Sequence, residues 1–246
     1  MTRFLTTVLL ILTCFLTSLN LFAEEPETNR ADVRIVVLGD SITKGVRTGV
    51  ASEEIYQHLL EQRLSLPNRS VEILNEGIGG ERTDQALKRL ETTVLSKKPD
   101  IVTVMYGTND SYVDPGKNRS RLTVEQYQSN LNAIVFKLQQ AKIQVILMTE
   151  PRWGSPARNG IGENPNLKLE KFMTACREVA KENEIPLVDN YQLWLDAEQK
   201  GANLSDWTTD ECHPNPLGHE KLTAAILPVL RPLVDQQKPA EKILRP

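Results

Sequence analysis

The hydrophobic residues of this chain fall into two alternating kinds of segment. Short runs that are nearly all apolar, and rich in Val and Ile, alternate with longer stretches in which apolar residues recur at helical spacing. Short apolar runs of this kind are typical of strands buried on both faces of a parallel sheet. They predict strands over residues 33–38, 71–75, 100–106, 143–148 and 185–188.

The longer stretches predict helices over residues 51–65, 82–96, 123–141, 166–183 and 216–235, with one more helical stretch after the fifth strand. Thr123 and Gln126 have the spacing of a capping box at the start of the third helix. Strand–helix alternation with right-handed crossovers predicts an α/β protein. We expect a three-layer α/β/α sandwich around a doubly wound, five-stranded parallel sheet of the flavodoxin-like type. No repeat or linker divides the chain, so a single domain is expected over residues 33–236.

The N-terminal segment has the pattern of a secretory signal peptide. Within residues 1–23, Arg3 precedes an apolar run, and the small residue Ala23 ends the segment. We expect cleavage after Ala23, a secreted or periplasmic protein, and no stable membrane span after cleavage. The alternative is an uncleaved anchor helix, which the polar residues late in the run argue against. Residues 24–32 are expected to form a linker, and residues 237–246 a charged C-terminal tail.

Composition and charge exclude several classes of protein. The 246 residues are 40% hydrophobic and 25% charged, as in a foldable globular domain. The 29 basic residues nearly balance the 32 acidic ones, giving a net charge of −3, so no nucleic-acid partner is expected. Cys14, Cys176 and Cys212 are too few and scattered for a zinc site or disulfide framework, and the last two are expected to be free thiols. No metal or cofactor is expected, and the oligomeric state is left open.

Polar or glycine-rich segments follow the predicted strands. Gly39-Asp40-Ser41 follows the first strand, residues 75–80 (NEGIGG) the second, and residues 107–110 (GTND) the third. Residues 210–214 (DECHP) come after the fifth strand and the helical stretch that follows it. In open α/β sheets, ligands bind outside the carboxyl ends of the strands. The four segments are therefore expected to meet at one edge of the sheet.

The residue types in these segments suit nucleophilic catalysis. A serine hydroxyl needs a base to remove its proton, and His is the usual base. Asp210, three residues before His213, could orient the imidazole. Each residue alone has an ordinary structural interpretation: a helix cap for Ser41, a turn for the glycines, a loop contact for Asn109 and a turn cap for Asp210. Their joint occurrence favours catalysis.

Together these segments resemble the SGNH hydrolases, also called GDSL-type esterases and lipases. The first family block is matched by Gly39-Asp40-Ser41, with Ile42 where Leu usually stands. The other blocks are matched by residues 75–80, 107–110 and 210–214, in the family's order. The resemblance implies Ser41 as nucleophile, His213 as base and Asp210 as its partner. It also implies an oxyanion hole made of the Ser41 and Gly80 backbone N–H groups and the Asn109 amide, with Gly79 as the rival of Gly80.

The other polar residues near these blocks are expected to be structural. Asp40 and Asp110 are expected to hold the loops, and His58 and His219 to be structural or surface residues. Asp210 is expected to lift the pKa of His213 above its ordinary value of about 6.5, because a nearby anion favours the imidazolium.

The loops after the third and fourth strands are expected to form the pocket walls. They are polar, without a long apolar lid, which argues against a lipase of long-chain fat; Arg152 and Trp153 are substrate-binding candidates. Since the secreted proteins that this chain resembles often remove small acyl groups, we expect a serine esterase. Its substrate would be a small-molecule or glycan ester, an acetylated sugar first, hydrolysed through an acyl-enzyme. A lysophospholipase or aryl esterase of the same family is the alternative.

Two other functional classes of protein fit the sequence less well. A metallophosphoesterase recruits several His together with carboxylates, but the chain has only His58, His213 and His219, and His58 falls in a helical pattern. A non-catalytic glycan-binding module is expected to have lost Ser41, Asn109, Asp210 or His213. None of these is replaced, so both classes are less favoured than the esterase.

Overall fold

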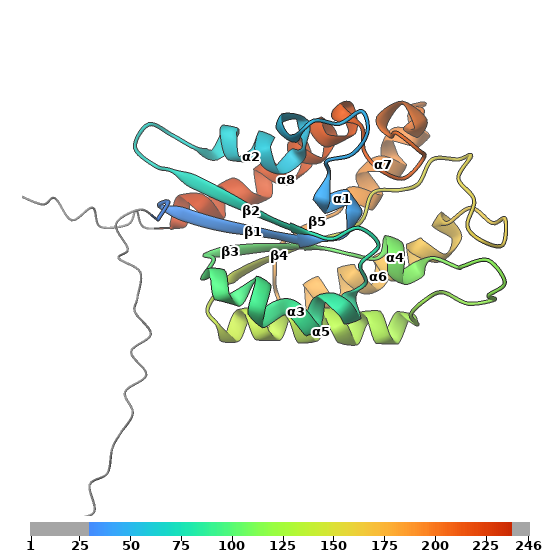
Figure 1. The fold of residues 1–246 in the computed structure, drawn as a ribbon, viewed down its shortest axis with the longest axis horizontal. Helices are drawn as coiled ribbons and strands as arrows, with labels where there is room; N and C mark the ends of the chain where they lie inside the picture. The colour runs from blue at the N-terminus through green and yellow to red at the C-terminus, as the bar shows by residue number, and fades with distance from the viewer. Residues whose placement is uncertain (1–29, 238–246) are drawn as a thin grey trace, which may run out of the picture.

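The computed structural model describes residues 30–237, which form a five-stranded parallel sheet between two layers of helices (Figure 1). The strand order is β2-β1-β3-β4-β5, the flavodoxin-like order. The strands are β1 (Val33–Gly39), β2 (Val71–Gly77), β3 (Ile101–Met105), β4 (Gln144–Met148) and β5 (Leu187–Val188). Each overlaps an apolar run in the sequence. The predicted fold class is confirmed.

Helices cover both faces of the sheet (Figure 1). One face carries α2 (Tyr56–Leu64) and α8 (Pro216–Gln236), and the other carries α3 (Thr83–Thr93), α5 (Val124–Gln140) and α6 (Asn166–Glu182). The helical stretch after β5 is α7 (Asn190–Gln199). Shorter elements are α1 (Ser41–Lys44), α4 (Thr108–Ser111) and the 3-10 turns η2 (Ser52–Glu54), η3 (Leu95–Lys97) and η4 (Leu204–Trp207). The five predicted long helices are present, whereas α1 and α4 were not predicted.

Alternate residues of the strands feed two separate hydrophobic cores. Ile35 and Val37 pack with α2 and α8, whereas Val36 and Leu38 pack with α3, α5 and α6. All four are fully buried, as predicted for central strands. The prediction of burial on both faces is wrong for β2, most of whose residues are partly or fully exposed, because β2 lies at the edge of the sheet.

The start of α5 shows the local signal that the sequence carries. The Thr123 hydroxyl accepts a hydrogen bond from the Gln126 backbone N–H at 3.2 Å. The Gln126 side chain in turn accepts one from the Thr123 backbone N–H at 2.9 Å. Both otherwise unpaired N–H groups are thereby satisfied, which confirms the predicted capping box.

The strand order places the ends of β1 and β3 at a topological switch point. The chain runs from β1 outward to β2, then crosses back over β1 to form β3 on its other side. Connections leaving β1 and β3 therefore diverge, and the crevice between them is where ligands bind in such sheets. Ser41 lies two residues after the end of β1, and Asn109 lies four residues after the end of β3.

The expected signal peptide and C-terminal tail fall largely outside the described residues. Residues 1–29 and 238–246 are not described, so they cover the whole signal peptide, most of the linker and nearly all of the tail. Between residues 30 and 237, no helix is both long and apolar enough to cross a membrane.

Candidate active site

Ser41 is the first residue of α1, in a tight turn directly after β1. The buried Asp40 carboxylate caps the helix by accepting a hydrogen bond from the Ile42 backbone N–H at 2.9 Å. A Cβ at Gly39 would clash with the Thr43 side chain, so only glycine fits at the end of the strand. The turn therefore fixes the Ser41 side chain at the carboxyl edge of the sheet.

His213 and Asp210 lie in the loop between η4 and α8. The Asp210 Oδ1 atom accepts a hydrogen bond from the His213 backbone N–H at 2.9 Å, which folds the loop back on itself. The His213 ring nitrogen Nδ1 lies 2.9 Å from Asp210 Oδ2, and its Nε2 lies 2.8 Å from Ser41 Oγ. Residues that are 172 positions apart in sequence thus form one hydrogen-bonded chain, Ser41–His213–Asp210.

An arginine stands at the far end of this chain. Arg47 Nη2 lies 2.7 Å from Asp210 Oδ2. Burial alone would raise the pKa of Asp210, but hydrogen bonds from His213, the His213 charge and Arg47 together hold it below its ordinary value. The Asp210 carboxylate is therefore ionised at neutral pH.

The pKa of His213 moves in the direction opposite to the prediction. Burial lowers it, Asp210 raises it and the nearby Arg47 cation lowers it, and the net result is a pKa below the ordinary 6.5. The prediction of a His213 pKa above the ordinary value is wrong, because loss of hydration and the charge of Arg47 outweigh the attraction to Asp210. The imidazole is neutral, and able to accept a proton, at neutral pH.

The amide of Asn109 is held at both ends. Its Nδ2 donates a hydrogen bond to Asp40 Oδ2 at 2.8 Å, and its Oδ1 accepts one from Arg121 at 3.2 Å. Arg121 is itself held by Asp114 at 2.7 Å. Because Oδ1 accepts from Arg121, the amide orientation is fixed, and the second Nδ2 hydrogen stays available for a ligand.

The loop after β2 carries Gly79 and Gly80 past the serine. A Cβ at Gly79 would lie 4.0 Å from Ser41 Cβ, so this loop borders the serine. Gly80 has φ +76°, where an L side chain is strained, although a Cβ there would meet no atom within 4 Å. Glycine is therefore required at position 80 by its backbone conformation and not by close packing. Within residues 30–237, the Ser41, Gly79 and Gly80 backbone N–H groups donate no hydrogen bond.

An ion pair between Glu81 and Arg89 holds this loop in place. Glu81, directly after Gly80, accepts hydrogen bonds from Arg89 at 2.6 Å and from the Tyr106 hydroxyl at 2.6 Å. Arg89 also donates to the backbone carbonyl of Glu76 at 2.7 Å. These contacts tie the start and the end of the loop to α3 and to the end of β3.

The two flanking aspartates hold loops, as predicted. Besides capping α1, Asp40 fixes Asn109. Asp110 accepts hydrogen bonds from the Thr83 hydroxyl at 2.6 Å and from the Thr83 backbone N–H at 3.0 Å. Burial raises the pKa of Asp110 to about 6 despite these bonds. Asp110 thereby joins the loop after β3 to the start of α3.

The two predicted substrate-binding residues differ in their surroundings. Arg152 is committed to α7, since it donates to the Tyr191 hydroxyl at 2.8 Å and pairs with Glu198 at 3.2 Å. Trp153 is partly buried and stacks on Tyr112, with ring centroids 6.1 Å apart. A contact between substrate and Trp153 stays a prediction. A contact between substrate and Arg152 also stays a prediction.

The remaining histidines and cysteines lie outside the hydrogen-bonded chain. His58 is on α2 beside Gln62, whereas His219 is buried in α8 and its Nδ1 faces the Tyr56 backbone N–H at 3.3 Å. Burial lowers the pKa of His219 to about 4, so it is neutral and structural. Cys176 and Cys212 are buried free thiols. In the described part of the chain, no three His, Cys, Asp or Glu side chains gather as metal ligands.

Comparison with known proteins identifies the family of this chain. Residues 37–221 match the model of the GDSL-like lipase/acylhydrolase family. The chain belongs to this family. It is therefore a hydrolase of carboxylic esters, and the resemblance seen in the sequence motifs is confirmed.

Curated relatives of this GDSL-like hydrolase come from bacteria and mammals. An isoamyl acetate-hydrolyzing esterase 1 homolog of Rattus norvegicus is 28% identical, over 80% of this chain and 81% of that protein. An acetylxylan esterase of Geobacillus stearothermophilus is 25% identical, over 65% and 73%. The uncharacterized lipoprotein YqeF of Bacillus subtilis is 26% identical, over 70% and 75%.

Solved structures show the same fold. A lipase/acylhydrolase from Enterococcus faecalis superposes with a TM-score of 0.67 at 27% identity, covering 85% of this chain and 99% of that one. The acetylxylan esterase Axe2 from Geobacillus stearothermophilus superposes with a TM-score of 0.68 at 22% identity, covering 81% and 94%. At 22% identity, the similarity to Axe2 shows a shared fold only.

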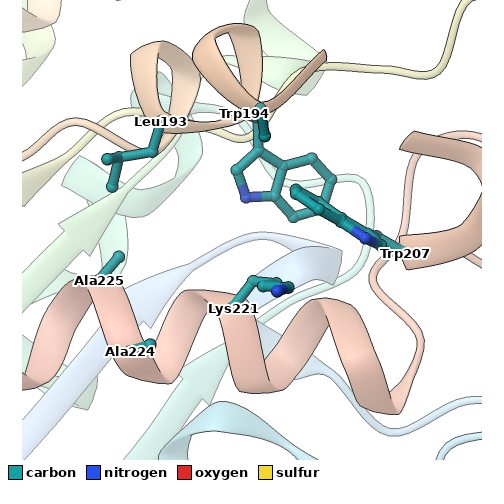
Figure 2. Close-up of a pocket in the computed structure, with 7 residues that line it drawn as sticks. Leu193, Trp194, Trp207, Lys221, Ala224 and Ala225 are labelled. Carbon is teal, nitrogen blue, oxygen red and sulfur yellow. The ribbon is translucent and has the colours of Figure 1, made fainter. Parts of the chain in front are cut away.

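A pocket of the GDSL-like hydrolase lies outside the Ser41–His213–Asp210 site. It has a volume of about 340 Å³ and lies between α7, η4 and α8 (Figure 2). The Trp194 and Trp207 rings meet edge to face with centroids 5.2 Å apart, and the Lys221 ammonium lies 5.1 Å from the Trp207 ring. Neither Ser41 nor His213 lines this cavity, so it is not the reaction site. Its full lining is Leu193, Trp194, Ala197, Trp207, Lys221, Ala224 and Ala225.

Three residues of the site carried no individual signal in the sequence. Arg47 pairs with Asp210, Arg121 holds Asn109, and Glu150 lies buried beside Asp40. Arg47 and Arg121 are ordinary loop arginines, and the partner of Arg47 is 163 positions away in the sequence. Glu150 lies two residues after the end of β4, and a carboxylate next to a buried strand is the one signal that could have directed attention to it.

Proposed function

We propose that Ser41, His213 and Asp210 form the catalytic triad of an esterase that removes short acyl groups. The unbroken hydrogen-bonded chain carries this proposal, with 2.8 Å between Ser41 and His213 and 2.9 Å between His213 and Asp210. A nucleophile within reach of its base, and a base oriented by a third group, is the arrangement that activates a hydroxyl.

In the first half of the reaction, Ser41 Oγ attacks the acyl carbon while His213 Nε2 takes the hydroxyl proton. The imidazolium that forms is stabilised by the ionised Asp210, which also holds Nδ1–H in the correct tautomer. His213 then returns the proton to the oxygen of the leaving alcohol as the ester bond breaks. The acyl group stays on Ser41 as an ester.

The second half releases the acyl group to water. His213 Nε2 takes a proton from a water molecule, whose oxygen attacks the acyl carbon, and then returns the proton to Ser41 Oγ. Ser41 is restored and the carboxylic acid leaves. Base and acid roles are exchanged at the same nitrogen, which needs a pKa that keeps the imidazole neutral at rest.

Three donors are suited to the oxyanion of both tetrahedral intermediates. Backbone N–H groups of Ser41 and Gly80 donate to no group among residues 30–237, and one Asn109 amide hydrogen is also available. Donors fixed in advance act on the charge that develops in the transition state, and each is worth about 2.7–4 kcal/mol. Gly79 offers an equally unpaired N–H and remains the alternative to Gly80.

We propose acetyl esters of carbohydrates as the substrate class. Two relatives are named for acetyl esters, the acetylxylan esterase and the isoamyl acetate-hydrolyzing esterase homologs. The loops over residues 112–122 and 151–166 are polar and offer no apolar lid for a long acyl chain. A partly buried Trp153 beside Tyr112 provides an aromatic surface of the kind that sugar rings pack against.

A substrate panel tests this proposal. Purified protein would be assayed on p-nitrophenyl esters of increasing acyl length, on acetylated xylo-oligosaccharides and on a lysophospholipid. We expect kcat/KM to be highest for acetyl esters and to fall as the acyl chain lengthens. A maximum at long acyl chains, or preference for the lysophospholipid, would contradict the acetyl assignment and support the lysophospholipase alternative.

We also propose export from the cytoplasm. The Arg3-led apolar run ending at Ala23 supports a cleaved signal peptide, and one relative is a lipoprotein. Expression of the full chain in a bacterial host, with fractionation and N-terminal sequencing, tests this. A mature N-terminus at Glu24 in the exported fraction is expected, and full-length protein in the cytoplasm would contradict it.

The pH dependence of activity should report the lowered pKa of His213. Because His213 must be neutral to accept the Ser41 proton, kcat/KM falls as the pH drops through its pKa. We expect this acid limb below the ordinary 6.5, since burial and Arg47 lower the pKa of His213. Replacing Arg47 with Ala removes the cation and should move the limb to higher pH.

Arg63→Ala is the matched control, because Arg63 forms an exposed ion pair with Glu220 at 2.7 Å and has no contact with the triad. Its limb should coincide with that of the unmodified protein. An Arg47→Ala limb that stays in place or moves to lower pH would contradict the role given to Arg47.

A further inference from the structure

We propose that Glu150 is a positioning residue: its carboxyl stays protonated and donates a hydrogen bond to Asp40, which in turn holds the Asn109 amide. The inference rests on the proposed role of Asn109 in the oxyanion hole. It adds to that role a buried acid pair beneath the catalytic loops, joining the ends of β4, β1 and β3.

Glu150 and Asp40 are both completely removed from solvent. Each has an exposed fraction of 0%, and their carboxyl groups are close enough to interact through a hydrogen bond and through charge. Two ionised carboxylates in such a place would repel each other without water to screen them. A single proton shared by the pair removes the repulsion and supplies a hydrogen bond.

The hydrogen bonds around the pair decide which partner holds the proton. Asp40 accepts from the Ile42 backbone N–H at 2.9 Å and from the Asn109 amide at 2.8 Å, and both bonds favour an ionised Asp40. The Thr108 backbone N–H lies near Glu150, but neither oxygen of Glu150 accepts a hydrogen bond of standard geometry within residues 30–237. The proton therefore belongs on Glu150, whose O–H can donate to Asp40.

The groups surrounding Glu150 offer no cation to neutralise it. They come from the turn between β1 and α1, from α2, α4, α5 and α6, and from the loop before α8, and none of them is Lys, Arg or His among the described residues. They are Asp40, Tyr56, Asp110, Tyr127, Cys176 and Cys212. Burial raises the pKa of Glu150 well above its ordinary value, and the Asp40 and Asp110 charges raise it further.

The backbone around Glu150 places it under the catalytic loop. A Cβ at Gly107 would lie 3.6 Å from Glu150 Cγ, so the side chain packs directly against the turn that begins α4 and carries Asn109. The Glu150 backbone N–H is anchored on Met173 Sδ of α6 at 3.1 Å. A change at Glu150 is thus transmitted to Asn109 both through Asp40 and through this turn.

The variants Glu150→Gln and Glu150→Leu show whether Asp40 needs a hydrogen-bond donor at position 150 or only a side chain that fills the space. Gln keeps the size and offers an N–H to Asp40, whereas Leu fills the space and leaves Asp40 without that donor. We expect Glu150→Gln to keep kcat within about threefold, while Glu150→Leu lowers kcat by about 10- to 100-fold with little change in KM, as for a displaced catalytic group. Glu150→Leu with unchanged kcat would overturn the proposal, as would Glu150→Gln as impaired as Glu150→Leu.

Two measurements on the folded protein need no ester, so their outcome is independent of the proposed function. Infrared difference spectra of unmodified protein against Glu150→Gln at about pH 7 should lose a protonated-carboxyl band. Because folding keeps the Glu150 proton that the unfolded chain releases above about pH 4.3, Glu150 lowers stability progressively as the pH rises. The Tm of Glu150→Gln minus the Tm of the unmodified protein should therefore increase as the pH rises. No lost band, or a Tm difference that moves the other way, would show an ionised Glu150 and overturn the proposal.

Discussion

Replacing Ser41 with alanine should lower kcat for an acetyl ester by about 10⁴- to 10⁶-fold, the loss seen when one member of a catalytic triad is removed. In the proposed mechanism, Oγ is the atom that attacks the acyl carbon, and it lies 2.8 Å from His213 Nε2, so its loss removes the nucleophile. Steady-state kinetics on p-nitrophenyl acetate measure the effect.

Stability separates this prediction from a general loss of fold. Ser41 caps no other element through its side chain, and the cap of α1 comes from Asp40. The Ser41→Ala variant should therefore melt close to the unmodified protein. Ser70→Ala is a matched control, since Ser70 is a serine before β2 whose hydroxyl bonds Asp32. A Ser41→Ala variant that keeps more than about a tenth of the rate would exclude Ser41 as the nucleophile.

Replacing Asn109 with alanine should lower kcat by about 10²- to 10³-fold and change KM little. The available amide hydrogen meets only partial charge on the carbonyl oxygen of the bound ester, but nearly a full charge on the tetrahedral oxyanion. The hydrogen bond therefore strengthens as the barrier is climbed, which affects kcat and not binding. Kinetics and Tm would be measured on the same preparation.

The alternative for Asn109 is that it only ties its loop to Asp40. That role predicts a lower Tm in parallel with activity, or a raised KM with unchanged kcat, and either result would contradict the oxyanion assignment. Asn132→Ala in α5 is a matched control, because it removes an amide that accepts from Asn183 at 2.8 Å and should leave kcat unchanged.

The sheet could be predicted because its central strands are nearly all apolar. Apart from Arg34, residues 33–38 are buried, as the apolar run predicts. The edge strand β2 fits less well because, apart from Val71, its residues are only partly covered or are exposed. Helices α1 and α4 escaped prediction because four residues are too few to show a helical period, and their starts depend on the buried Asp40 and on Gly107.

The sequence motifs predict which residues meet at the candidate site, whereas the contacts that support these residues could not be predicted. Motif spacing indicates Ser41 and His213, but the pairing of Arg47 with Asp210 joins residues 163 positions apart, and either arginine or aspartate alone has many possible partners. The prediction for the pKa of His213 was wrong for the same reason. Its direction depends on how deeply the ring is buried and on a cation whose position only the fold determines.

The most direct test of the account is the position of the covalent intermediate. The protein would be treated with a p-nitrophenyl alkylphosphonate, which acylating serines attack but cannot release, and digested for peptide mass spectrometry. One equivalent of adduct on Ser41 is expected, abolished in Ser41→Ala and strongly slowed in His213→Ala, because His213 must remove the Ser41 proton. An adduct on another residue, or an active enzyme that gains no adduct at Ser41, would contradict the proposed mechanism.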